Sequence, residues 1–476
     1  MTAILIDLLI DLVFGVTSLC ALLVMDTFTT WAVMYLAFQA VYWGILRYKK
    51  TEFKFSAKCG MKFSFARLVG ISLIFVCLLS LKPYRYDIKR IVLNGLPSEI
   101  TGIEKQEVEE KPAQPEEPEQ AEEPLPESAV ETEQTEFHIR MVGDILIHNN
   151  ILNSCKKEDG SYDFSGIFSD TKELSEKADI TILNQETVLG GEEMGYSGYP
   201  AFCSPQSLGD AEVNAGYNVI LGATNHAMDK GVRGILDEVS YWRRNYPDVN
   251  LVGMHDSQED ANRLRIVEVG TTNKIKVAIL NYTYGTNGIS KPSDMPYLVD
   301  YLSEEKVAAD LKAAREAADF VIVCPHWGVE YKFEPSNAER QWAKVFADNG
   351  ADLIIGAHPH VVQPIEWIDG MDGHKTLCYY SVGNFVTGTS RTGNDVWKQL
   401  VSGMADVTIA RNEDGTVGIK QNDIIPLICH WEGGKYRVIE ISKYDENMAN
   451  LNDIKKQDPT FSLAGMQEFI KQIWAK

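Results

Sequence analysis

Cysteine is scarce beyond the N-terminal part of this chain, and the few cysteines there form no pattern. Five lie after residue 137, at Cys155, Cys203, Cys324, Cys378 and Cys429. Because their number is odd and none has Cys-x-x-Cys spacing, the sequence indicates neither a disulfide framework nor a thiolate zinc site. Cys324 and Cys378 fall within apolar runs and are expected to be small core residues.

Positive charge is also in short supply. The 476 residues contain 45 Lys and Arg against 67 Asp and Glu, a formal net charge of -22. Residues 1–90 are an exception, since they hold 11 Lys and Arg against 5 Asp and Glu, so the remainder is more acidic than the total suggests. Nucleic-acid binding needs clustered cations to contact phosphates, and this charge balance argues against it.

Long hydrophobic runs are confined to the first ninety residues. They occupy residues 8–25, 29–46 and 68–81, and the third reaches spanning length only with Phe63, Phe65 and Ala66. About 20 apolar residues cross the hydrocarbon core, so residues 1–90 are predicted to form a membrane anchor of about three transmembrane helices. A cleaved signal peptide is the alternative for the third run, but residue 68 is too late for one.

The charges between the second and third runs set the expected orientation. Seven Lys and Arg residues crowd positions 47–67, which favours a cytoplasmic loop. Three spans then place the rest of the chain outside the cell. Residues 91–136 are rich in Glu and Pro, which predicts a disordered, extended linker ahead of an extracellular domain at 137–476.

From residue 137 onward the sequence repeats one theme. An apolar run typical of a buried strand is followed by a loop with metal-binding or hydrogen-bonding residues, and then by a helical segment. The apolar runs occupy residues 137–142, 180–183, 219–221, 320–324, 353–355 and 377–380. Amphipathic helices are expected at 303–318 and 337–349, and a hairpin around Asp414-Gly415. The alternation predicts an α/β sheet whose polar residues gather at one edge.

Two histidines follow the strand predicted at 353–355. Gly356 ends the apolar run, and His358 and His360 come shortly after it. In an extended loop, side chains two residues apart can point at one metal cluster, whereas on a helix they would diverge by roughly 200°. A chance pair of surface histidines is the alternative, and the other strand ends weigh against it.

The same kinds of side chain recur at the other strand ends. Of the 9 histidines, five fall in these loops, at His148, His226, His326, His358 and His360. Asp144, Glu186 and Asn225 fall there too. A single such histidine is more often satisfied by the backbone or exposed in a turn. Together, imidazole, carboxylate and amide oxygen are the mixed ligands that suit Zn, Mn or Fe, so the set predicts a metal site.

Six motifs stand at these strand ends. They are Gly143-Asp144, Asn184-Gln185-Glu186, Thr224-Asn225-His226 with Asp229 and Gly231, His326-Trp327-Gly328-Val329-Glu330-Tyr331, Gly356-Ala357-His358-Pro359-His360-Val361 and Ser381-Val382-Gly383-Asn384-Phe385. In this order they resemble the signatures of the bacterial capsule-synthesis protein CapA family, over roughly residues 137–409. Members are associated with poly-γ-glutamate capsule synthesis or export. The family is similar to calcineurin-like metallophosphoesterases, which implies an αββα sandwich of two mixed sheets with one or two divalent metals.

The resemblance, together with the chemistry of the side chains, implies a role for each residue. The expected metal ligands are Asp144, Glu186, Asn225, His326, His358 and His360. His226 is expected to protonate a leaving group while Asp229 orients its ring. The expected substrate-binding residues are Glu330, Trp327, Tyr331 and Asn384, with packing or an ordinary supporting role as the alternative for the first three and a turn-stabilising role for Asn384. Phosphoesterases usually carry Asp-x-His, whereas His148 stands four residues after Asp144, so one-metal and two-metal centres both stay open.

Two functions from different classes follow. The first is a metal-dependent hydrolase acting on a phosphoester or an amide of an anionic envelope polymer such as poly-γ-glutamate. The second is a non-catalytic binding scaffold in a membrane synthesis and export complex, with a CapB-like ligase and a CapC-like membrane protein as partners. Because an acidic domain repels an anionic polymer, binding would rely on metals or local cations. The complete ligand set favours the hydrolase.

Overall fold

A computed structural model describes residues 135–474 of the chain. The membrane anchor predicted at residues 1–90 lies outside the described residues, as does nearly all of the linker predicted at 91–136. Within residues 135–474, no helix combines the length and the apolar character that crossing a bilayer requires.

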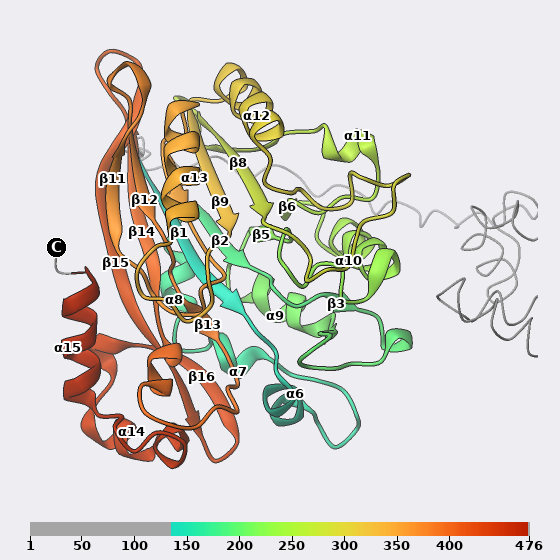
Figure 1. Cartoon of the computed structure of the whole chain (residues 1–476), viewed down its shortest axis with the longest axis vertical. Coiled ribbons are helices and arrows are strands. Elements are labelled where there is room, and N and C mark those ends of the chain that lie inside the picture. The colour runs from blue at the N-terminus through green and yellow to red at the C-terminus, as the bar shows by residue number, and fades with distance from the viewer. Residues whose placement is uncertain (1–134, 475–476) are drawn as a thin grey trace, which may run out of the picture. The chain divides into compact units, whose positions relative to one another are not determined.

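The described residues form two large β-sheets and one small one. The first sheet has the order β16-β15-β14-β1-β2-β5-β6, with β13 paired to β1, and the second has the order β11-β12-β10-β9-β8-β7 (Figure 1). The strands of the first sheet are β1 (Glu136–Ile145), β2 (Ile180–Asn184), β5 (Val219–Leu221), β6 (Asn250–Val252), β13 (Asn384–Val386), β14 (Val401–Arg411), β15 (Val417–Glu432) and β16 (Lys435–Glu440). Those of the second are β7 (Arg265–Val269), β8 (Ile275–Thr283), β9 (Phe320–His326), β10 (Leu353–Ile355), β11 (Ile365–Asp369) and β12 (Lys375–Tyr379). β3 (Leu189–Gly190) and β4 (Ser204–Pro205) pair with each other.

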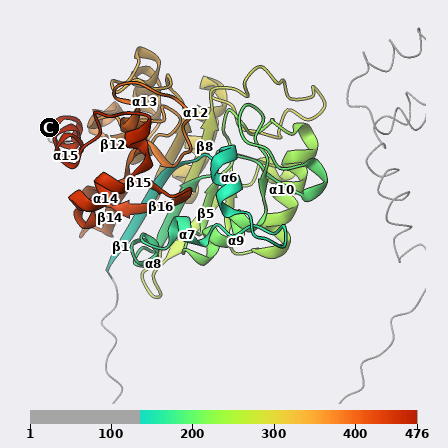
Figure 2. The same cartoon turned by 90° about the horizontal axis from the view of Figure 1, so that it is seen from below.

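Helices cover the outer faces of both sheets. The helices are α6 (Asn149–Cys155), α7 (Ser165–Phe168), α8 (Lys172–Glu176), α9 (Ser207–Asn214), α10 (Gly231–Asn245), α11 (Gln258–Ala261), α12 (Glu304–Ala317), α13 (Asn337–Asp348), α14 (Glu446–Leu451) and α15 (Leu463–Trp474). Figure 2 shows α12 and α13 on one side of the strands and α7 and α9 on the other. The molecule therefore has a helix, sheet, sheet, helix layering.

Three buried hydrophobic clusters correspond to these layers. One lies between the sheets and joins residues of both, such as Ile139 of β1 and Ile322 of β9. A second packs α12 and α13 on the outer face of the second sheet, with Leu311 and Phe346 at its centre. The third lies between the first sheet and its helices. Burial on both faces explains why the central strands are continuous apolar runs.

The elements expected from the sequence are present. Glu304–Ala317 begins after the N-cap Ser303, and Asn337–Asp348 begins with a capping box between Ser336 and Glu339. Both caps satisfy amide groups that the first helical turn leaves unpaired. The turn at Asp414-Gly415 joins β14 to β15, as predicted. Strand β8 was not predicted, although it pairs with both β9 and the edge strand β7 in the second sheet.

The parallel strands bring the predicted motifs to one edge. β1, β2, β5 and β6 run parallel in the first sheet, and β8, β9, β10 and β12 run parallel in the second. Loops that follow parallel strands leave the sheet at the same edge. The two sheets face each other, so the loops of both meet there.

Candidate metal centre

The ends of five strands position the predicted metal ligands. Asp144 lies at the end of β1, Glu186 follows β2, Asn225 follows β5, His326 ends β9, and His358 and His360 follow β10. All six side chains are buried, with exposed fractions of 7% or less. Residues more than 200 positions apart in the sequence therefore converge in one buried space.

Asp144 lies at the centre of the hydrogen bonds in this space. Its Oδ1 accepts from Asn184 Nδ2 at 2.8 Å and from the backbone N–H of His358 at 3.2 Å. Its Oδ2 lies 3.0 Å from His360 Nδ1. The carboxylate thus fixes both the loop after β10 and the orientation of the His360 ring.

Glu186 differs from Asp144 because neither of its carboxylate oxygens has a hydrogen-bond partner within residues 135–474. Its Oε1 lies 3.6 Å from His326 Nε2 and 3.8 Å from His360 Nε2, beyond hydrogen-bonding range. A buried carboxylate without partners is costly, and such groups in native proteins usually face an ion or water. The unpaired oxygens therefore make Glu186 a candidate ligand for a cation.

His326 and Asn225 face each other across the two sheets. His326 Nε2 lies 2.9 Å from Asn225 Oδ1, and its Nδ1 lies 3.3 Å from Asn184 Nδ2. The ring of His326 is 4.8 Å from that of His358, measured between centroids. His358 Nδ1, like the oxygens of Glu186, is buried without a partner among the described residues.

His358 and His360 both adopt left-handed backbone conformations, with φ of 99° and 58°. Such angles are unfavourable for residues with a Cβ, and they cluster at functional sites where surrounding contacts hold them. The N–H of His358 is held by Asp144, and Pro359 between them accepts from the N–H of Tyr331 at 2.7 Å. The loop therefore turns both rings inward.

Burial and charge shift the pKa values of these groups. Burial lowers the pKa of His326 and of His358 far below the usual range, so both imidazoles are neutral, as a metal ligand must be. Burial also raises the pKa of Glu186, and the charge of Asp144 adds to this. Burial alone would lower the pKa of His360, but the charge of Glu186 and the hydrogen bond to Asp144 raise it to about 9. A cation here would favour ionised Glu186 and neutral His360.

Two groups of three ligand atoms meet the spacing of a metal site. Glu186, His326 and His358 form one, and Asp144, Glu186 and His360 form the other, with all atoms of a group within 4.8 Å of one another. Glu186 belongs to both. Carboxylate and imidazole donors suit divalent Zn, Mn or Fe, and the partnerless atoms of Glu186 and His358 are the ones a cation would satisfy. The donor set fits a divalent metal.

His226 and Asp229 form a pair at the border of this space. His226 Nδ1 lies 2.7 Å from Asp229 Oδ2, which also accepts from the backbone N–H of Phe202. The edge of the His226 ring packs at right angles to Phe202, 4.7 Å between centroids. Asp229 thus holds the ring with Nε2 directed away from it, which is the arrangement predicted from the sequence.

Tyr331 and Glu330 lie at the exposed border of the centre. The Tyr331 ring, 37% exposed, is 5.8 Å from the ring of His360. The Arg391 guanidinium covers that ring at 4.2 Å from its centroid. Glu330 is exposed, and its charge contributes to the raised pKa values of Glu186 and His360. Both positions are open to a substrate.

The sequence analysis predicted that Trp327 and Asn384 bind substrate, but both side chains are buried. Trp327 is 1% exposed, packs on Phe346 and Tyr380, and donates its Nε1–H to the carbonyl of Tyr380. It is a core residue beneath the centre, and the packing alternative holds. Asn384 is 1% exposed; its Oδ1 lies 3.0 Å from His360 Nδ1 and its amide donates to the His360 carbonyl. Its side chain therefore positions His360.

His148 lies near the centre but outside both ligand groups. Its Nδ1 accepts from the N–H of Gly388 at 3.3 Å, and its ring packs edge-on against Phe202 at 5.4 Å. Burial lowers its pKa to about 4.

Two residues near the centre were missed by the sequence analysis. The ring of Tyr284 is 4.8 Å from that of His358, and Asn287 contacts Asn225 and His226 at 3.4 and 3.5 Å. Both follow β8, the strand that was not predicted. The apolar run at 277–280 was the signal that could have found them.

The order and spacing of the ligands along the chain match a known family. The family model "Bacterial capsule synthesis protein PGA_cap" matches residues 138–389, which include all six predicted ligands and the pair His226 and Asp229. The chain belongs to this family. The PGA_cap match ends before β14, so β14 to β16 and the two C-terminal helices are additions to the matched region.

Curated relatives agree with the PGA_cap assignment. The "PGA biosynthesis protein CapA" of Bacillus subtilis (strain 168) is 34% identical over 171 residues, which cover 36% of this chain and 42% of that protein. The "Capsule biosynthesis protein CapA" of Bacillus anthracis is 29% identical over 265 residues, which cover 53% of this chain and 60% of that protein. The matched segments span between two fifths and three fifths of these relatives.

Two solved structures have a partly similar chain path. The calcineurin-like phosphoesterase YfkN of Bacillus subtilis has a TM-score of 0.35 at 14% identity, covering 71% of this chain and 99% of that chain. The Haemophilus influenzae NAD nucleotidase NadN has a TM-score of 0.38 at 12% identity, covering 71% of this chain and 60% of that chain.

Proposed function

We propose that this protein is a metal-dependent hydrolase of capsule or poly-γ-glutamate synthesis, with an αββα domain of the calcineurin-like metallophosphoesterase type. Its target is a phosphoester or an amide within an anionic envelope polymer. The names of the two CapA relatives support the process, and the buried ligand set supports the chemistry.

One observation carries the proposal. The two oxygens of Glu186 and Nδ1 of His358 are buried together without hydrogen-bond partners in the described part of the chain. Each unsatisfied polar group costs about 1–3 kcal/mol, and a cation bound between these atoms would offset that cost. Their presence among four further ligand-type side chains indicates a site that is completed by something bound.

The ligands have distinct parts in this proposal. Asp144, Glu186, Asn225, His326, His358 and His360 would hold one or two divalent ions, with Glu186 the residue common to both ligand groups. When bound, such ions lower the pKa of a coordinated water and stabilise negative charge on the attacked group. His226 would donate a proton to the leaving group from Nε2, since Nδ1 is held by Asp229.

The setting of the domain is part of the same proposal. The hydrophobic runs of residues 1–90 would anchor the protein in the cell membrane as a multi-pass anchor, with residues 137–476 extracellular. A CapB-like ligase and a CapC-like membrane protein are the expected partners.

Elemental analysis of the purified full chain in detergent, paired with an activity screen, tests the proposal. We expect one or two equivalents of Zn, Mn or Fe, and turnover of either phosphoesters or γ-glutamyl amides that a chelator abolishes. Bound metal without turnover of either class would favour the non-catalytic scaffold. Absence of transition metal after reconstitution with each of the three ions would refute the centre itself.

A further inference from the structure

The loop between β8 and α12 (residues 284–303) touches the metal centre at its start. The Tyr284 ring packs 4.8 Å from the ring of His358. Asn287 accepts a hydrogen bond from Asn225 Nδ2 at 3.4 Å, and its amide lies 3.5 Å from His226 Nδ1. Asn287 and Gly288 both have positive φ, 48° and 77°, so the chain reverses sharply at this contact. The first four residues of the loop therefore form one wall of the centre.

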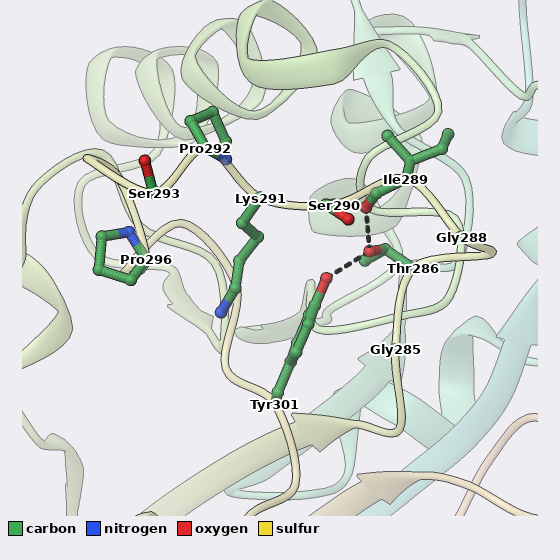
Figure 3. A pocket seen from close by; sticks show the side chains of 10 residues that line it. All are labelled: Gly285, Thr286, Gly288, Ile289, Ser290, Lys291, Pro292, Ser293, Pro296 and Tyr301. Carbon is green, nitrogen blue, oxygen red and sulfur yellow. Dashed lines mark hydrogen bonds between the residues drawn. The ribbon is translucent and has the colours of Figure 1, made fainter.

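The same loop borders an open cavity immediately beyond this turn. The cavity has a volume of about 440 Å³, and Gly285, Thr286 and Gly288 line it next to Asn287 (Figure 3). The Thr286 hydroxyl donates to the carbonyl of Ile289 at 2.6 Å and also bonds the hydroxyl of Tyr301. These bonds hold the wall of the cavity in place.

One cation faces this cavity. Figure 3 shows the Lys291 side chain extending beside Tyr301, and its Nζ lies 3.8 Å from the centroid of that ring. Nζ donates one hydrogen bond, to the carbonyl of Val299 at 2.6 Å, which leaves two of its three N–H groups available. Within residues 135–474, no carboxylate lies at ion-pair distance from Lys291. The half-buried ammonium is thus held in place without an ion pair, although the charge of Asp300 acts on it.

We infer that this cavity binds a carboxylate of the substrate, with Lys291 as its cationic contact. A single ammonium balances a single negative charge, and an ammonium–carboxylate hydrogen bond is stronger than one between neutral groups. The cation is held in place before binding by Val299 and Tyr301, which lowers the entropy lost on binding.

The inference rests on the proposed function for the role of the metal centre, and it names the substrate class. Neighbouring residues of one loop contact both sites, because Asn287 touches His226 while Gly288 lines the cavity. A chain of repeated acidic units can place one bond at the centre and a neighbouring carboxylate in the cavity. A phosphoester whose reacting phosphate is its only anionic group has no second one to offer. The cavity thus selects for anionic oligomers.

The experiment measures binding by the metal-loaded full chain in detergent, using calorimetric titration. The probes are a γ-linked glutamate trimer and its uncharged α-carboxamide analogue. We expect the charged trimer to bind more tightly, and Lys291→Gln to raise its Kd about tenfold with no effect on the neutral trimer. Lys312→Gln removes the same charge from an exposed position on α12 and should leave both affinities unchanged.

A second pair of variants does not alter the buried part of the cavity. Ser293 is exposed at the cavity, so Ser293→Glu adds a repelling charge there while Ser293→Gln adds only the volume. We expect weaker binding of the charged trimer in Ser293→Glu only. Equal Kd values for wild type and Lys291→Gln, or for charged and neutral trimers, would overturn the inference, as would no binding at all. Lys291-dependent binding by a protein that hydrolyses nothing would support the cavity and refute the proposed hydrolase.

Discussion

Two buried clusters of histidine and carboxylate in this molecule differ in whether their polar atoms are satisfied. At His255, one ring nitrogen lies 2.9 Å from Asp300 and the other 3.4 Å from Asp260. Each carboxylate has a further cation, Arg265 at 2.8 Å for Asp260 and Lys306 at 3.2 Å for Asp300. At the metal centre, by contrast, Glu186 and His358 keep partnerless atoms. The satisfied cluster needs nothing further to stabilise its charges, whereas the unsatisfied one has polar atoms that a bound cation would satisfy.

The positions of the two clusters support this difference. His255 follows β6 and its N–H donates to the carbonyl of Leu298, so its cluster fastens the far end of the loop at 284–303. The start of that loop reaches the metal centre through Tyr284 and Asn287. The His255 cluster therefore stabilises the far end of the loop at 284–303, and the start of the same loop contacts the metal centre.

The largest expected effect comes from removing a ligand. His360→Ala should lower metal affinity by about 10²-fold or more, and turnover with it, because it removes one imidazole and leaves Asp144 without its ring partner. Metal content by mass spectrometry and hydrolysis rates measure both. His374→Ala is the matched control, since that histidine bonds the carbonyl of Ala351 away from the centre. Normal occupancy in His360→Ala would contradict the ligand assignment.

The next effect separates proton transfer from metal binding. His226→Gln should reduce kcat by about 10²-fold to 10⁴-fold with unchanged metal content, because the ring belongs to neither ligand group. Asp229→Asn should give a smaller loss, as it only weakens the positioning of the ring. If His226→Gln lost its metal as His360→Ala does, His226 would be a ligand and the proposed role would be wrong.

A stability effect is expected at the satisfied cluster. His255→Ala should lower the free energy of unfolding by about 2–3 kcal/mol, because it leaves Asp260 and Asp300 each with one partner fewer in a buried setting. Urea unfolding of the full chain measures this, and metal content should stay at the wild-type value. Loss of metal in His255→Ala, after correction for unfolded protein, would show that the two clusters are coupled.

The smallest effect is the pH dependence of that contribution. Burial alone lowers the pKa of His255, but the hydrogen bonds to Asp260 and Asp300 outweigh it and leave the pKa raised. A raised folded-state pKa gives stability that is fully present below about pH 6.5 and is lost as pH rises through the folded pKa. The difference in unfolding free energy between wild type and His255→Gln should therefore shrink from pH 6 to pH 9. A difference that grows over this range would contradict the assignment.

The sequence predicted which side chains converge because strand ends are marked by polar residues as well as by the end of an apolar run. A buried apolar run followed by Gly, His, Asp or Asn places those side chains at one edge of a parallel sheet, and six of them meet there. β8 was not predicted because its apolar residues are followed by Asn281, Tyr282 and Thr283. None of these is a histidine or a carboxylate, so the strand end did not match the pattern of the other motifs. Tyr284 and Asn287 were missed with it.

Trp327 shows another limit of the pattern. It stands between His326 and Glu330 in a motif that resembles a site, yet consecutive residues at the end of a strand point to opposite faces. His326 faces the space between the sheets, and Trp327 packs against Phe346 of α13. The spacing of residues in the sequence does not show which face of the sheet each side chain occupies until the register of the strand is known. The convergence of the ligands themselves depends on contacts between two sheets, which no local pattern encodes.

The left-handed backbone at His358 and His360 has a consequence for protein engineering. If residues 356–360 were copied into another loop, the sequence would be transferred but the backbone torsion angles would not. Hydrogen bonds with Asp144 and Tyr331, which lie outside this segment, stabilise those angles. A transplant would have to carry β1 and the Tyr331 turn along with it. The smallest unit that could be transferred therefore consists of three chain segments: β1, the turn at Tyr331 and residues 356–360.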